Sequence, residues 1–117
     1  MKYAYLFLIL FIAACSSNSN KVKEINNPIE EITWIKEFIS ETKKSPFPTK
    51  VVISQYKFKE ETVFLINHCF KCADEMKVLY NTKKEKLSTF GGMIPNQNKY
   101  PNFFEEATEK KELWRSF

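Results

Sequence analysis

The sequence predicts an α+β fold, in which an N-terminal amphipathic helix packs on a small antiparallel sheet of four to five strands and a short helix follows near the C-terminus. Two patterns predict it. Apolar residues recur at helical spacing after Pro28, and later runs are rich in β-branched and aromatic residues. A length of 117 residues with 44% hydrophobic residues suits one folded domain with a single core. We assign this domain to residues 27–117.

The first element expected is a helix that begins near Asn27 and Pro28. Asn is a favoured capping residue and Pro suits the first helical position. The apolar stripe of this helix consists of Ile29, Ile32, Ile35, Phe38 and Ile39. Lys43-Lys44 and Pro46 predict its end. Trp34 lies beside the stripe, where an aromatic at the edge of the core is favoured over an exposed binding residue.

Two antiparallel strand pairs are expected after the helix. The first pair is connected without the Gly or Asn that tight hairpins favour, so the sequence does not predict its turn type. The expected strands are residues 51–58, 62–66, 77–80 and 86–90. Gly91-Gly92 then marks a turn, and residues 102–107 suggest a short helix. Residues 112–115 suit either an extension of that helix or a final strand.

The N-terminal segment has the layout of a cleaved signal peptide. Lys2 supplies a positive charge, and Tyr3 to Ala14 contains no charged residue. A helix needs about 20 apolar residues to span a bilayer, so this run is too short to do so comfortably. It ends in Ile12-Ala13-Ala14-Cys15, which resembles the lipobox of bacterial lipoproteins. That resemblance implies removal of residues 1–14 and lipidation of Cys15 through its thiol.

A polar segment follows the predicted lipidation site. Residues 15–26 begin Cys-Ser-Ser-Asn-Ser-Asn, which is typical of a flexible tether. We therefore expect a protein held in the cell envelope by acyl chains on Cys15, with the membrane as its first partner. Ser16 favours the outer over the inner membrane, because an aspartate after the lipidated cysteine is the usual signal for inner-membrane retention. The membrane face is left open.

Cys69 and Cys72 form the one chemically distinctive pair in the predicted domain. In an exported protein the favoured interpretation is a structural disulfide that tightens the loop between the second and third strands. A redox role is an alternative, since Lys71 and His68 carry groups able to stabilise a thiolate. A zinc site is the least supported alternative, because it needs four ligands and few are nearby. No metal or other cofactor is expected.

Several motifs spread over the predicted domain resemble an uncharacterised family of small bacterial lipoproteins that share a domain of unknown function. The matching positions are Tyr56-Lys57-Phe58-Lys59, Val63-Phe64, Cys69 and Cys72, Leu79-Tyr80, Gly91-Gly92, Pro101-Asn102-Phe103 and Trp114. Two positions depart from the family pattern: Glu60 replaces a common turn glycine, and Tyr100 replaces a frequent cysteine. The resemblance supports fold and location only, and it favours a strand at residues 111–116.

Two classes of function are compatible with these features. The first is a non-enzymatic module that binds an envelope protein, peptide or glycan through an exposed sheet face or the loop from Gly91 to Pro101. The second is a thiol-disulfide oxidoreductase that uses Cys69 and Cys72. We favour the first, because no catalytic motif is present and no catalytic residue is assigned. Nucleic-acid binding is not expected, since the net charge is only +4 and the charges are interspersed.

Overall fold

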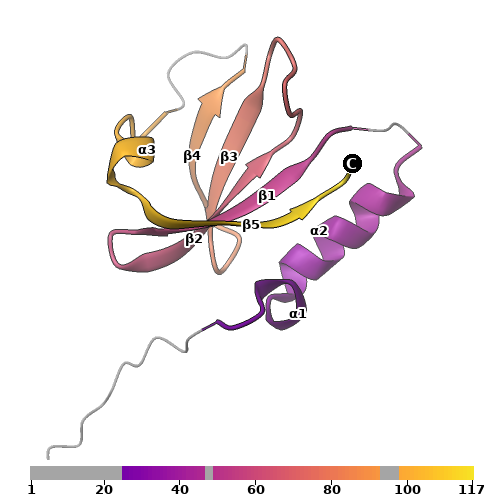
Figure 1. Cartoon of the computed structure of the whole chain (residues 1–117), viewed down its shortest axis with the longest axis horizontal. Helices are drawn as coiled ribbons and strands as arrows, with labels where there is room; N and C mark the ends of the chain where they lie inside the picture. The colour runs from indigo at the N-terminus through magenta and orange to yellow at the C-terminus, as the bar shows by residue number, and fades with distance from the viewer. Residues whose placement is uncertain (1–24, 47–48, 93–97) are drawn as a thin grey trace, which may run out of the picture.

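The computed structural model of the protein describes residues 25–46, 49–92 and 98–117 (Figure 1). The predicted signal peptide, Cys15 and the tether as far as residue 24 lie outside these residues. The elements in chain order are α1 (Pro28–Glu31), α2 (Thr33–Lys44), β1 (Val52–Phe58), β2 (Glu61–Asn67), β3 (Met76–Asn81), β4 (Lys86–Gly91), α3 (Phe103–Glu106) and β5 (Thr108–Arg115). None of the helices among the described residues is long and apolar enough to span a membrane.

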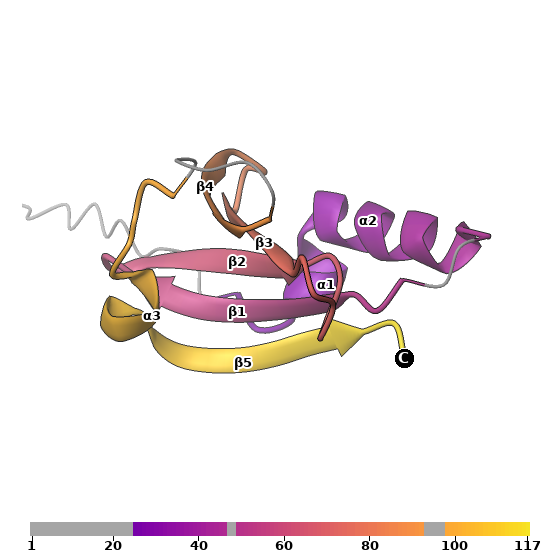
Figure 2. The same cartoon turned by 90° about the horizontal axis from the view of Figure 1, so that it is seen from above.

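One antiparallel sheet of five strands dominates the fold. Its strand order is β4-β3-β2-β1-β5, so the chain adds neighbouring strands from β1 to β4 and then returns to place β5 beside β1. Figure 2 shows that the sheet is strongly curved, with β3 and β4 turned out of the plane of the other strands. The expected α+β class fits broadly, although the helices are short and the sheet predominates.

The register of β1 and β2 divides the sheet into two faces. Ile53 pairs with Ile66 and Tyr56 pairs with Val63. Because side chains alternate along a strand, these two pairs point to opposite sides. We call the side that carries Ile53, Phe64 and Ile66 the first face, and the side that carries Val52, Ser54, Tyr56, Val63 and Leu65 the second face. Most of these residues are apolar, so each face needs covering by other parts of the chain.

The first face shares a buried cluster with α2. Ile35 and Ile39 join Ile53 and Phe64 in this cluster, and Ile35 and Ile53 are completely buried. Trp34 lies at the edge of the cluster, 5.9 Å from the ring of Phe64, and its indole N–H donates a hydrogen bond to the carbonyl of Thr82. This placement confirms the core-edge interpretation of Trp34 and ties α2 to the turn after β3.

The predicted N-terminal helix is not continuous. Ile32 separates α1 from α2 in an extended conformation, with φ −102° and ψ 104°. Asn27 makes no side-chain capping bond, contrary to expectation; its backbone carbonyl accepts hydrogen bonds from the amides of Glu30 and Glu31 instead. Ile32 still belongs to the buried cluster of the first face. Its amide donates a hydrogen bond to the carbonyl of Pro28, and its carbonyl accepts bonds from the amides of Ile35 and Lys36.

The second face is covered at one end by α3. Phe103 is completely buried there, with ring centroids 5.1 Å from Tyr56 and 5.0 Å from Phe58. The same ring lies 5.5 Å from Phe90 of β4. The contacts with Tyr56 and Phe58 are edge-to-face, an arrangement in which the positive edge of one ring meets the negative face of another. A single side chain therefore links β1 to β4 across the second face, and no helix of the described residues covers the other end of that face.

Residues 108–115 form the final strand that the family resemblance favours. β5 is longer than expected and pairs with β1 through two register shifts, one between Ile53 and Ser54 and one between Gln55 and Lys57. Such bulges bend a strand and re-aim its side chains. They bring Glu112 opposite Ser54, and Arg115 lies opposite Val52, on the second face.

Replacing Phe103 with alanine should destabilise the protein strongly, because the ring is fully buried between β1 and β4. We expect a loss of about 3–5 kcal/mol in the free energy of unfolding, measured by chemical denaturation. Phe104→Ala is the matched control, since Phe104 is its neighbour but is 49% exposed, and it should cost about 1 kcal/mol or less. Equal losses of stability for the two variants would contradict the central place of Phe103 in the packing between β1 and β4.

Candidate functional site

The uncovered end of the second face forms a hollow of about 260 Å³. Its floor comes from the paired strands β1 and β2, where Ser54 lies opposite Leu65 and Val52 lies opposite Asn67. The other lining residues are Tyr56, Phe70, Lys77, Lys110, Glu112 and Arg115. All four floor residues are less than 9% exposed, so a ligand in this hollow would contact a preformed surface.

Three cationic side chains border the hollow from both sides. Lys77 comes from β3, while Lys110 and Arg115 come from β5. The ammonium group of Lys77 lies 5.3 Å from the ring of Phe104, and that of Lys110 lies 6.0 Å from the ring of Tyr56. Neither lysine forms an ion pair with a carboxylate in the described part of the chain.

The third cation, Arg115, is partly neutralised by a neighbour on the same strand. Its guanidinium group donates two hydrogen bonds to the carboxylate of Glu112, in the fork geometry that suits this pair. These contacts lower the pKa of Glu112 and raise that of Arg115. Both groups are exposed to solvent, so the pair orients Arg115 more than it stabilises the fold. The positive charge of Lys110 also contributes to the lowered pKa of Glu112, so this one carboxylate partly offsets two of the three positive charges.

An aromatic pair closes the end of the hollow beside Arg115. Phe70 stacks on Phe117, with ring centroids 5.5 Å apart and an interplanar angle of 26°. The guanidinium carbon of Arg115 lies 4.8 Å from the centroid of Phe117 and 5.6 Å from that of Phe70. The amide of Phe70 also donates a 2.8 Å hydrogen bond to the carbonyl of Lys50. The loop after β2 and the end of the chain are therefore held together, as Figure 2 shows.

The residue after Arg115 fastens this end of the chain to β1. The hydroxyl of Ser116 accepts a 2.8 Å hydrogen bond from the amide of Val51 and donates a 2.6 Å bond to the carbonyl of Thr49. Its own amide donates a 2.9 Å bond to the carbonyl of Val51. Because these contacts continue the β1–β5 pairing beyond Arg115, the positions of Arg115 and Phe117 are set by the backbone.

Cys69 and Cys72 flank Phe70 in the loop between β2 and β3. Their sulfur atoms are within disulfide-bonding distance and their Cα atoms are 5.5 Å apart. The amide of Cys69 donates a 3.1 Å hydrogen bond to the side-chain oxygen of Asn67, whose amide group bonds to the carboxylate of Glu75. Lys71 adopts a left-handed conformation with φ 61°. This tight turn presents the ring of Phe70 toward β5.

His68 is adjacent in sequence to Cys69 but its ring packs on α2. The ring lies edge-on to Phe38, with centroids 6.0 Å apart, and burial lowers the pKa of this histidine below 6.5. Lys71 places its ammonium group 5.5 Å from the ring of Phe70. Within the described residues, no three His, Cys, Asp or Glu side chains are placed to hold a metal ion.

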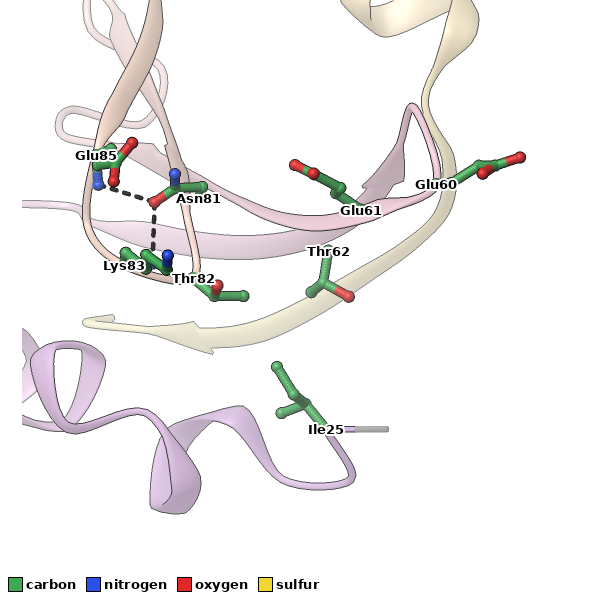
Figure 3. A pocket seen from close by; sticks show the side chains of 8 residues that line it. All are labelled: Ile25, Glu60, Glu61, Thr62, Asn81, Thr82, Lys83 and Glu85. Carbon is green, nitrogen blue, oxygen red and sulfur yellow. Dashed lines mark hydrogen bonds between the residues drawn. The ribbon is translucent and has the colours of Figure 1, made fainter. Parts of the chain in front are cut away.

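A second hollow, of about 300 Å³, lies at the opposite end of the strands (Figure 3). Ile25 lines it together with the turns after β1 and β3, which contribute Glu60 and Glu85 among other residues. The side-chain oxygen of Asn81 accepts hydrogen bonds from the amides of Lys83 and Glu85, both at 2.9 Å, so it shapes the β3–β4 turn. In Figure 3 the carboxylates of Glu60 and Glu85 point apart. This hollow is best explained by the packing of turns.

The structure brings together the predicted cysteine pair and places in the hollow further residues that the sequence did not single out. Cys69 and Cys72 lie close to each other, whereas Cys15 is outside the described residues. Lys77, Lys110 and Arg115 were not predicted as a group. The only signal available was their place on strands, and a charge on an exposed strand is usually just solvated.

Comparison with known proteins gives one match. Residues 36–116 match the family model of the Domain of unknown function (DUF6970). No curated protein and no solved structure matches the chain.

Acidification should destabilise the protein through His68, the single histidine of the chain. Because burial lowers its pKa in the folded state, the unfolded chain binds more protons below pH 6.5. The stability contribution is complete above pH 6.5 and is lost as the pH falls toward the folded-state pKa. We expect a lower melting temperature at pH 5.5 than at pH 7.5, and a smaller difference for His68→Gln. An unchanged difference in the variant would contradict this effect of burial.

Proposed function

The chain belongs to the DUF6970 family, and from that premise we propose that it is a lipid-anchored bacterial envelope protein whose domain binds a partner without catalysing a reaction. The family description gives no function, so membership supports relatedness alone. The proposed organisation is a signal peptide at residues 1–14, a lipidated tether at residues 15–26 and a binding domain at residues 27–117. The outer membrane is the proposed location, on the basis of Ser16.

The support for anchoring comes from the N-terminal sequence. A lysine precedes an uncharged apolar run, and the run ends in Ile12-Ala13-Ala14-Cys15. Two small residues before the cysteine allow the extended backbone to enter a peptidase cleft, and the thiol then accepts the lipid. Several acyl chains give durable anchoring, whereas a single chain gives marginal, reversible binding. The polar residues after Cys15 would let the domain sample the space beside the membrane.

The hollow on the second face is the observation that carries the binding function. Ser54 is only 7% exposed, yet its side chain lines the hollow. Lys77 and Lys110 also line it, and neither forms an ion pair within the described residues. A hollow with a few convergent polar groups is the usual form of a binding site. An envelope protein, peptide or glycan is the proposed class of partner.

The thiol-disulfide alternative has one observation in its favour, the close approach of Cys69 and Cys72. Oxidoreductases of the thioredoxin type place such a pair at a helix N-terminus inside a βαβ unit. Here the pair follows β2 and leads into the antiparallel β3, and the ring of His68 packs on Phe38. These features favour a disulfide that positions Phe70 over a catalytic one.

Mass spectrometry of the native protein tests the anchoring. We expect a mature chain that begins at Cys15 and carries acyl chains, and we expect a clickable palmitate analogue to label it in growing cells. Cys15→Ala should abolish the label, while Cys69→Ala, which removes a different thiol, should retain it. A native protein that keeps residues 1–14 and an unmodified Cys15 would contradict the proposal.

The reduction potential of the Cys69–Cys72 pair separates the two functions. A structural role predicts a potential below about −300 mV and slow reaction with thiol reagents. The potential is measured by equilibration with dithiothreitol buffers. A potential between about −120 and −270 mV, the range of thiol-disulfide oxidoreductases, together with a depressed pKa for Cys69, would instead support an oxidoreductase.

A further inference from the structure

We propose that the hollow on the second face binds an acidic glycan, a polymer whose sugars carry carboxylates. This inference rests on the proposed binding function and names the ligand class for that site. It follows from the charges around the hollow, the polar group on its floor, the character of the β5 edge and the position of the hollow relative to the tether.

The charges favour an anion. Lys77 and Lys110 come from strands on opposite sides of the β1–β2 floor, and Arg115 completes the border beside Phe70. Among the described residues Glu112 is the one acidic residue that lines the hollow, and it already pairs with Arg115. An anion on the floor would therefore meet two ammonium groups that form no ion pair in the described part of the chain. Glycans with several carboxylates could also reach more than one cation at once.

The floor supplies a hydrogen-bonding group as well as a shape. Ser54 lines the floor, is 7% exposed as a residue, and its hydroxyl makes no hydrogen bond to another residue in the described ranges. A hydroxyl can donate to a carboxylate or exchange hydrogen bonds with sugar hydroxyls. Tyr56 and Phe70 add aromatic walls to the same hollow. Aromatic faces beside polar groups are well suited to sugar rings, which have apolar C–H surfaces and polar edges.

A peptide that adds a strand to the sheet fits this site less well. β5 is an edge strand, but its pairing with β1 has two register shifts and Glu109 has a left-handed conformation with φ 55°. Five of the eight residues of β5 are also charged, namely Glu109, Lys110, Lys111, Glu112 and Arg115. Bulges and charges of this kind prevent strand addition at exposed edges.

The hollow and the first described residue of the chain lie toward opposite ends of the strands. Ile25, the first described residue, lies with Glu60 and Thr82 at the turns after β1 and β3. The hollow lies toward the other end of β2, beside the loop that carries Phe70. The seven residues of β2 span about 20 Å from the first Cα to the last. Figure 1 likewise shows the chain entering α1 at one end of the molecule and the C-terminus at the other. The hollow therefore lies toward the end of the domain that is remote from Ile25, where a polymer outside the membrane can reach it.

Binding of hexagalacturonate to the protein purified in detergent tests the inference. We expect calorimetry to show binding at low salt that weakens as sodium chloride is added, and no binding of the neutral sugar maltohexaose at the same concentration. Hexaglutamate and glycerol phosphate serve as probes for an acidic peptide and for a lipid headgroup. Equal or tighter binding of either probe, or equal binding of maltohexaose, would overturn the assignment to acidic glycans.

Two neighbouring lysines on β5 provide matched variants. Lys110→Gln removes a cation from the hollow and should weaken hexagalacturonate binding about tenfold. Lys111→Gln makes the same change one residue away, on the first face opposite Gln55, and should change the affinity less than twofold. Both side chains are exposed, so neither variant should unfold. Equal effects of the two variants would show that binding depends on overall charge and not on the hollow.

A photo-crosslinking residue at position 110 distinguishes failure of this inference from failure of the proposed function. If hexagalacturonate does not bind but the crosslinker reproducibly captures one envelope component in cells, the ligand class is wrong and the binding function stands. If neither the sugar nor any envelope component is captured, both proposals are wrong.

Discussion

The pairing register of β1 and β2 is the constraint on which the rest of the structure depends. Ile53 opposite Ile66 commits one set of side chains to the first face, and Ser54 opposite Leu65 commits the alternate set to the second. A slip by one residue would exchange the two sets, moving the polar Ser54 under α2 and apolar residues into the hollow. The two-residue turn at Lys59 and Glu60 holds this register, with positive φ angles of 49° and 64° that match the twist of a tight hairpin.

The two faces have different partners, and this difference produces the site. Ile35 and Ile39 of α2 join the cluster of the first face, whereas Phe103 covers only one end of the second. The remaining end receives the loop with Phe70 and the terminal part of β5 with Arg115. A disulfide between Cys69 and Cys72 therefore has a structural use, because it narrows the loop that brings Phe70 to β5. The hollow exists because no helix in the described part of the chain covers this surface.

Much of the fold could be predicted from the sequence, because a local run of β-branched and aromatic residues is enough to predict a strand. The break at Ile32 could not, since a helical pattern of apolar residues continues across it and only the extended backbone of Ile32 shows the interruption. The site was harder still. Lys77 and Arg115 are distant in the chain and border the same hollow only because of the sheet order and the bulges in β5. No local sequence pattern predicts either feature.

The central claim is that the second face of the sheet is a binding surface, and backbone NMR during a titration with hexagalacturonate tests it most directly. Residues that line the hollow should shift together with one saturating curve, with Ser54, Lys77 and Arg115 among them. The NMR signals of Lys111, on the first face, and of Trp34, which packs beside it on α2, should not shift. Shifts confined to the first face, or to the turns around Glu60, would contradict the account.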